Sequence, residues 1–221
     1  MDKAGYGLIE TMRVREERIP FLDRHLARLG RSLGELGLPK PSQDVPALVR
    51  PFAATGDAVL RVEVRDGRAS VTVRELPSLA PPVVITASEP HQPYPHKTTE
   101  RDCFTDAGKE AEVAEADDAL LVTHEGWVAE GTMWTVFWWD GDVLRTPALD
   151  LGILPGIGRA RVLELVTPGE QGRHQKGALA GRSLFLTNAV RGVVPIASLD
   201  GAPVPPDPRT VDLAQRFWPT M

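Results

Sequence analysis

The sequence predicts an α+β fold, a mixture of helices and strands arranged in two sub-domains. Strand-like and helix-like segments alternate in the first third of the chain, and a series of short strands follows later. Between them, the proline-rich stretch from Pro77 to Pro82 interrupts both patterns, as a linker does. We therefore expect a small N-terminal sub-domain at residues 1–80. A larger C-terminal sub-domain should occupy residues 83–221 and carry Lys97.

The first sub-domain should contain one strand, two helices and a hairpin. Leucines recur at intervals of three and four residues from Leu22 to Leu36, which is the spacing of an amphipathic helix, and Gly37 is a stop signal. Asp66 and Gly67 form a strong turn signal between two strand-like runs. The expected ranges are 6–14 for the first strand, 21–38 and 45–54 for the helices, and 58–64 and 69–74 for the hairpin.

The second sub-domain should combine short strands with three helices. Glycine-containing turns at residues 124–126 and 140–142 separate strand-like runs, so four consecutive strands are interpreted as a meander. The expected strands are 83–87, 119–123, 127–130, 132–139, 143–146, 183–187 and 193–197. The expected helices are 104–116, about 156–166, and one that ends at Phe217.

Composition excludes several classes of protein. Of the 221 residues, 42% are hydrophobic and 25% charged, which are ordinary values for a globular chain. The net charge of −5 argues against a nucleic-acid or anionic-membrane partner. The longest apolar run is too short to span a bilayer, and the first residues do not resemble a signal peptide, so we expect a soluble, cytoplasmic protein.

Familiar nucleotide and metal motifs are missing. There is no Walker A sequence, and Arg161 stands where a dinucleotide-binding motif that began at Gly156 would have its last glycine. His91 and His96 flank a proline-rich turn without a carboxylate at ligand spacing. They are interpreted as loop residues, and no metal site is expected.

Three elements nevertheless carry possible chemistry. Lys97 follows a proline-rich loop that could aim it into a cleft, although a plain surface lysine would look the same. The pair Gly156 and Gly158 opens a helix, and such a start either binds phosphate through bare N–H groups or is an ordinary turn. Glu130 ends a strand, where it could either bind a protonated pyridine nitrogen or be an ordinary glutamate at a strand end. Together the three are the parts of one cofactor site.

The order of the motifs resembles class IV (fold type IV) pyridoxal-phosphate enzymes, whose architecture is that of D-amino-acid aminotransferase. The resemblance covers about residues 6 to 198. The segments that carry it are residues 8–14, 21–29, His96-Lys97-Thr98-Thr99-Glu100-Arg101, Val128-Ala129-Glu130-Gly131-Thr132, Leu154-Pro155-Gly156-Ile157-Gly158-Arg159, and Leu186-Thr187-Asn188-Ala189-Val190-Arg191-Gly192.

The resemblance implies roles for individual residues and a homodimer. Lys97 would bind pyridoxal 5'-phosphate covalently and then move protons, and Glu130 would pair with the ring nitrogen. Arg101 or Arg191 would meet a substrate carboxylate. The phosphate ligands would be the Arg28 side chain, the N–H groups of Ile157 and Gly158, and the turn at Asn188 and Ala189.

Within that family, the Lys97 and Asn188 segments are most similar to aminodeoxychorismate lyases. Two positions depart from the usual pattern: Thr135 stands where an asparagine is common, and Phe104 where close relatives often have tyrosine. The first hypothesis is 4-amino-4-deoxychorismate lyase, which gives para-aminobenzoate and pyruvate, a step of folate biosynthesis. The alternatives are an aminotransferase acting on a D-amino acid, a branched-chain amino acid or an amine, and a non-catalytic cofactor-binding relic.

Overall fold

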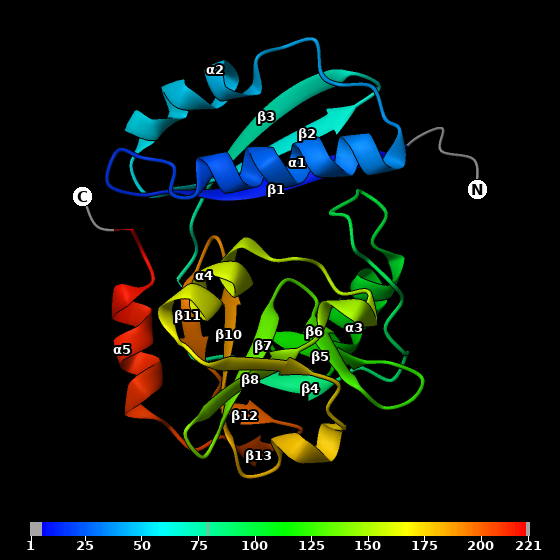
Figure 1. Ribbon diagram of the computed structural model, residues 1–221, viewed down its shortest axis with the longest axis vertical. Helices are drawn as coiled ribbons and strands as arrows, with labels where there is room; N and C mark the ends of the chain where they lie inside the picture. Colours follow the sequence, from blue (N-terminus) through cyan, green and yellow to red (C-terminus); the bar gives the residue numbers. More distant parts are fainter. Residues whose placement is uncertain (1–5, 79, 220–221) are drawn as a thin grey trace. The chain divides into compact units, whose positions relative to one another are not determined.

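A computed structural model describes residues 6–78 and 80–219, so Leu79 of the expected linker lies outside the described part. The chain forms two compact units (Figure 1). The first runs to Ser78 and also includes His96–Glu100, and the second contains the stretch up to Pro95 and everything from Arg101 onward.

The first unit is a three-stranded antiparallel sheet with a helix against it. Strands β1 (Gly7–Val14), β2 (Ala58–Arg65) and β3 (Arg68–Glu75) follow one another across the sheet, and α1 (Leu22–Leu36) lies along β1 (Figure 1). Leu29 and Leu33 of α1 pack into one core with Leu8, Met12 and Leu60 of the sheet. The leucine spacing therefore predicted the helix and its buried face correctly.

The second expected helix is shorter than predicted. Its α-helical part, α2, covers only Val45–Val49, and a 3₁₀-helix, η1, continues over Arg50–Thr55. Pro51 explains the change, because proline has no N–H to donate to an α-helical hydrogen bond and its ring crowds the preceding turn.

The segment that carries Lys97 belongs to the first unit, whereas we expected it in the second. The Ile9 N–H donates to the Lys97 carbonyl at 2.8 Å, and the Thr99 N–H donates to the Gly7 carbonyl at 2.8 Å. On the helix side, His96 Nδ1 lies 3.1 Å from Ser32 Oγ. Residues 96–100 are thus hydrogen-bonded along the free edge of β1.

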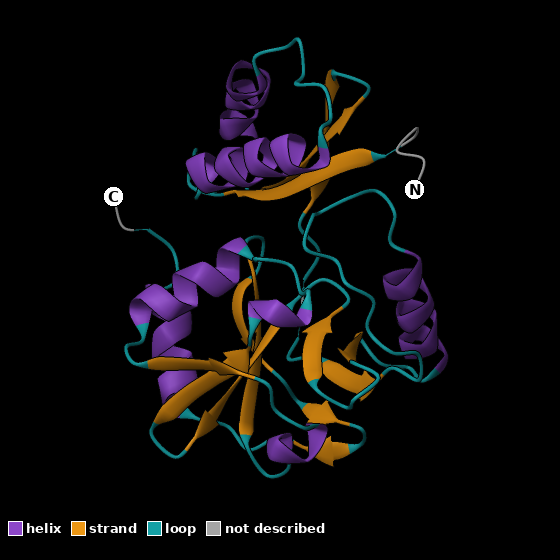
Figure 2. Ribbon diagram, turned by 45° about the vertical axis from the view of Figure 1, so that its right-hand side comes forward, coloured by secondary structure: helices purple, strands orange, loops and turns teal. Residues whose placement is uncertain are grey.

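The second unit contains two five-stranded sheets, shown in orange in the lower part of Figure 2. One sheet has the strand order β11-β10-β7-β8-β9 and the other has the order β13-β12-β4-β5-β6. The bounds of the strands are β4 Val83–Thr86, β5 Asp118–Val122, β6 Val128–Gly131, β7 Thr135–Asp140, β8 Val143–Pro147, β9 Gly169–Gly172, β10 Ser183–Asn188, β11 Gly192–Pro195, β12 Ser198–Leu199 and β13 Ala202–Pro203.

The expected four-stranded meander is wrong. β5 and β6 pair in one sheet, whereas β7 and β8 pair in the other, and the turn at residues 132–134 lies between them. β7 consequently begins at Thr135, three residues later than expected. Turn signals correctly separated the strands but could not show that the chain changes sheets at Gly131. β9 was not predicted either, because it is short and polar, and it pairs in parallel with β8.

Three helices complete this unit: α3 (Asp102–Val113), α4 (Ile157–Leu165) and α5 (Pro208–Arg216). Two short 3₁₀-helices, η2 (Leu149–Leu151) and η3 (Lys176–Leu179), lie in the connections. Trp134, Trp138 and Trp139 are buried inside the unit, and Trp139 Nε1 donates to Thr210 Oγ1 of α5 at 3.1 Å. These tryptophans belong to the core of the unit.

Candidate active site

The first unit contains a buried ion pair with a histidine attached. Glu10 of β1 accepts from Arg28 Nε at 2.8 Å and from Arg28 Nη2 at 2.6 Å, while His25 Nδ1 lies 2.6 Å from Glu10 Oε2. Burial by itself raises the pKa of Glu10, but the charge and hydrogen bonds of Arg28 outweigh it. The pKa of this carboxyl is therefore lowered to about 2, with a smaller contribution from His25. Glu10 thus holds the Arg28 side chain in one orientation.

Lys97 lies in the same unit as this pair. Burial lowers the pKa of His25; the hydrogen bond and charge of Glu10 oppose this shift, whereas the charges of Arg28 and Lys97 add to it. The backbone of Lys97 is held by its hydrogen bond to Ile9, next to Glu10 in β1. The structure therefore places two of the predicted residues, Arg28 and Lys97, near one polar cluster on β1 and α1.

Glu130, at the end of β6, is a buried carboxylate of the second unit. Its Oε1 atom lies 3.0 Å from His91 Nε2 and accepts the Leu154 N–H at 3.2 Å. The other oxygen, Oε2, has only a longer contact with the same N–H, at 3.4 Å. Glu130 is about 95% buried, so its carboxylate does not face solvent.

The start of α4 offers a place for a phosphate group. Gly156 precedes the helix, and no side chain caps its N–H groups. A Cβ atom on Gly158 would lie 2.8 Å from the backbone of Asn188 and from Thr187 Oγ1, so β10 approaches the helix too closely for any side chain. Thr187 Oγ1 is itself buried without a hydrogen-bond partner in the described part of the chain. Bare N–H groups beside an unpartnered hydroxyl fit a bound phosphate.

The turn after β10 is held by Asn188. Its Oδ1 atom accepts the N–H groups of Val190 at 2.9 Å and Arg191 at 2.8 Å, and its Nδ2 atom donates to the Met133 carbonyl at 3.3 Å. The side chain of Asn188 therefore shapes the turn, while its backbone contacts Gly158. Of the predicted phosphate ligands, Ile157, Gly158, Asn188 and the buried Ala189 are brought together in this unit.

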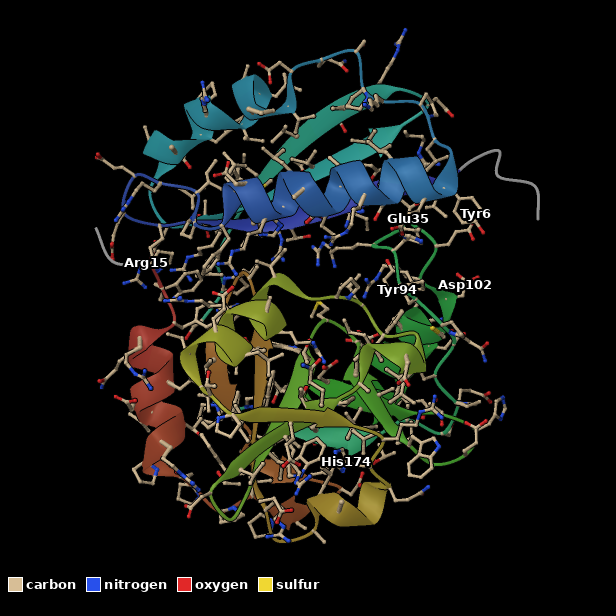
Figure 3. All side chains as sticks on the ribbon, viewed as in Figure 1. Tyr6, Arg15, Glu35, Tyr94, Asp102 and His174 are labelled. Carbon is tan, nitrogen blue, oxygen red and sulfur yellow. The ribbon has the colours of Figure 1, made fainter. Side chains whose placement is uncertain are left out.

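Arg101 is held by aromatic rings and a carbonyl group. Its guanidinium lies 4.9 Å from the centre of the Phe104 ring and 5.5 Å from that of Tyr94, which is labelled in Figure 3. It also donates to the Thr132 carbonyl, two residues after Glu130. Phe104, one of the two departures from the family pattern, thus supports this arginine. A substrate-binding role of Arg101 or Arg191 stays a prediction.

Two residues near Glu130 were not predicted from the sequence. His91, interpreted as a loop residue, is buried against the Glu130 carboxylate. Asp118, which begins β5, is also buried; it accepts the Thr132 N–H at 3.2 Å and the Thr132 hydroxyl. Burial raises the pKa of Asp118 to about 6, although these hydrogen bonds oppose the shift. No local signal marks either residue, since their partners are distant in sequence.

Two negative findings concern the described part of the chain. No group of three or more His, Cys, Asp or Glu side chains there could hold a metal ion. No helix in residues 6–78 and 80–219 is long and apolar enough to cross a membrane.

The fold is that of a fold type IV aminotransferase. The Amino-transferase class IV family matches residues 7–199, which is most of the chain. The chain belongs to this family.

Individual relatives bear different names. Aminodeoxychorismate lyase of Bacillus subtilis is 32% identical over 88 residues, which are 38% of this chain and 30% of that enzyme. The match thus spans under a third of that relative. D-alanine aminotransferase of Bacillus licheniformis is 24% identical over 227 residues, covering 89% of this chain and 80% of that one. A fold IV-transaminase from Curtobacterium pusillum superposes with a TM-score of 0.83 and 28% identity, over 96% of this chain and 83% of that one.

The family is pyridoxal-phosphate dependent, and the residues of this chain fit the cofactor. The bare start of α4 beside Thr187 fits its phosphate, and the buried Glu130 carboxylate fits a protonated ring nitrogen. A hypothetical aminotransferase from Mycobacterium tuberculosis, solved in its PLP-bound form, has the same fold, with a TM-score of 0.85 and 22% identity over 96% of this chain and 87% of that one.

Proposed function

We propose that Lys97 is the catalytic lysine that binds pyridoxal 5'-phosphate. In this proposal Glu130 binds the ring nitrogen, and the N–H groups of Ile157 and Gly158, the Asn188–Ala189 turn and Arg28 bind the phosphate. The observation that carries it is Gly158, which lies at the uncapped start of α4. Thr187 and Asn188 pack so closely against Gly158 that no larger residue fits there. The order of the motifs along the chain supports the same assignment.

When bound, the cofactor supplies an electron-withdrawing ring that stabilises negative charge on the carbon next to the substrate nitrogen. The residues of this chain do the rest. Glu130 accepts the hydrogen bond of the ring nitrogen and so keeps it protonated. Lys97 takes a proton from the substrate carbon at its Nζ atom and returns it to another position. Arg101 or Arg191 binds a carboxylate of the substrate and orients it.

We further propose that the reaction is that of 4-amino-4-deoxychorismate lyase. The bond between the ring carbon and the enolpyruvyl oxygen breaks, and the ring becomes aromatic by losing a proton. The leaving group departs as enolpyruvate and takes up a proton to become pyruvate, and the other product is para-aminobenzoate. Support comes from the Bacillus subtilis lyase and from the similarity of the Lys97 and Asn188 segments to lyase motifs. By the same resemblance we propose a cytoplasmic homodimer that takes part in folate biosynthesis.

A second candidate is an aminotransferase. The match to D-alanine aminotransferase extends over 89% of this chain, more than the 38% matched to the Bacillus subtilis lyase. An aminotransferase must bind an amino donor and an oxo-acid acceptor in turn, whereas a lyase releases pyruvate from one substrate. The two activities therefore differ in their need for an acceptor.

The test begins with the visible spectrum of the purified protein loaded with pyridoxal phosphate. We expect an absorption band that borohydride removes, and that Lys97→Ala lacks. Pyruvate release from 4-amino-4-deoxychorismate without an added oxo acid is then expected. Lys109→Ala, on the exposed face of α3, is the matched lysine control and should keep both properties. Amino transfer to 2-oxoglutarate or pyruvate without lyase turnover would favour the second candidate. A wild type that shows the absorption band but neither activity would leave the relic hypothesis, and a colourless wild type would exclude the proposed cofactor site.

A further inference from the structure

His91 is held rigidly in the second unit. Its backbone N–H donates to the Val122 carbonyl at the end of β5 at 2.7 Å, and its ring meets the Phe104 ring edge-on at 6.2 Å between centres. The side chain is about 1% exposed. A buried polar ring is expected to have a specific partner, because burying an unpaired polar group is unfavourable.

That partner is Glu130, and the surroundings select one tautomer of the histidine. His91 Nε2 lies 3.0 Å from Glu130 Oε1, whereas His91 Nδ1 is buried with no hydrogen-bond partner in the described part of the chain. A proton on Nδ1 would be an unpaired buried donor, and it would leave the Nε2 lone pair facing a carboxylate oxygen. The neutral ring with its proton on Nε2 avoids both, so the imidazole donates to Glu130.

We propose that His91 is a positioning residue of the cofactor site, which holds Glu130 in the orientation that binds the ring nitrogen. His91 and the Leu154 N–H both donate to Oε1, so Oε2 remains the oxygen with the weaker contact. Oε2 is therefore the atom that accepts the hydrogen bond of the cofactor. This inference rests on the proposed role of Glu130 as the partner of the ring nitrogen.

A neighbouring cavity provides a direct test by chemical rescue. His91 lines a cavity of about 370 Å³ together with Pro93, Thr123, His124 and Trp127. Removal of the imidazole by His91→Ala would extend this cavity toward Glu130. Because the cavity is many times larger than the roughly 30 Å³ that one water molecule occupies in the liquid, we expect it to admit free imidazole, which would replace the missing donor.

The experiment measures the dissociation constant of pyridoxal phosphate by absorbance for four variants. We expect His91→Ala to weaken binding by about tenfold to a hundredfold, the range for losing a hydrogen bond to a charged group. Added imidazole should restore most of this loss. His91→Gln retains an N–H donor and should bind within a few-fold of wild type. His124→Ala removes the other histidine of the cavity and should neither weaken binding nor respond to imidazole.

The fourth variant, Glu130→Ala, separates this inference from the proposed function. If the wild type binds the cofactor and Glu130→Ala binds equally well, the role of Glu130 itself is wrong. If Glu130→Ala weakens binding and His91→Ala does not, only the role of His91 is wrong. A loss in His91→Ala that neither imidazole nor glutamine restores would also overturn it, because a merely structural role predicts that result.

A second readout needs no cofactor. Nitrogen-15 spectra of the histidine rings in the apoprotein, assigned by comparison with His91→Gln, should show His91 protonated at Nε2 and unprotonated at Nδ1. A proton on Nδ1 would contradict the inference. This measurement remains decisive even if His91→Ala fails to fold.

Discussion

Glu10 and Asp118 are both buried carboxylic acids, yet their environments shift their pKa values in opposite directions. In the first unit, Glu10 has a bidentate partner in Arg28, and its pKa is lowered to about 2. In the second unit, Asp118 is surrounded by neutral donors from Thr132, and burial raises its pKa to about 6. The difference teaches that burial alone does not determine the charge of a carboxyl group, because a cation in contact reverses its effect.

The largest expected effect on stability comes from replacing Arg28, the cation that pairs with Glu10. Arg28→Met leaves Glu10 buried with His25 beside it but without its arginine partner, which should lower the free energy of unfolding by about 3–5 kcal/mol. Urea denaturation of the apoprotein measures it. The double variant Glu10→Gln/Arg28→Met removes both charges and should recover part of the loss. Equal stability of the single and double variants would show that the ion pair is not the cause.

The pH dependence of stability sharpens the same comparison. Because the folded pKa of Asp118 is raised from 3.8 to about 6, the unfolded chain loses this proton first, and stability falls as pH rises through that window. The expected loss is about 3 kcal/mol, since each pKa unit corresponds to about 1.4 kcal/mol. Glu10 acts oppositely: its contribution is present above its ordinary pKa of 4.5 and is lost as pH falls toward 2.

Asp118→Asn is the variant that isolates this effect, because its side-chain oxygen can still accept from Thr132. Urea midpoints measured from pH 4 to pH 8 should fall for the wild type relative to Asp118→Asn, mainly below pH 6. Parallel curves for the two proteins would mean that Asp118 is ionised throughout this range in the folded state.

Two glycines, one in each unit, give the smallest expected effects. Gly158→Ala would place a methyl group 2.8 Å from the backbone of Asn188, so it should destabilise the protein by about 1–3 kcal/mol and weaken cofactor binding. Gly30 lies inside α1, where a Cβ would meet no atom within 4 Å, and Gly30→Ala should stabilise by about 0.5–1 kcal/mol. Thermal unfolding measures the stability of both variants. An unchanged stability of Gly158→Ala would mean that β10 and α4 can move apart without cost.

Elements with strong local signals could be predicted from the sequence. The leucine spacing located α1, and the turn at Asp66 and Gly67 located the hairpin of β2 and β3. The order of the motifs along the chain also indicated the family. The change of sheets after Gly131 was not predictable in this way, because the residues of a strand do not by themselves specify which strand it pairs with.

The sequence by itself therefore determined α1, the hairpin and the family, since these depend on periodicity and on short motifs. Only the tertiary structure decided that His91 pairs with Glu130, that Asp118 is buried beside Thr132, and that residues 96–100 join β1. These contacts link residues that are 39, 14 and about 90 positions apart. Their partners are chosen by the packing of whole sheets and helices, which no short segment of the chain encodes alone.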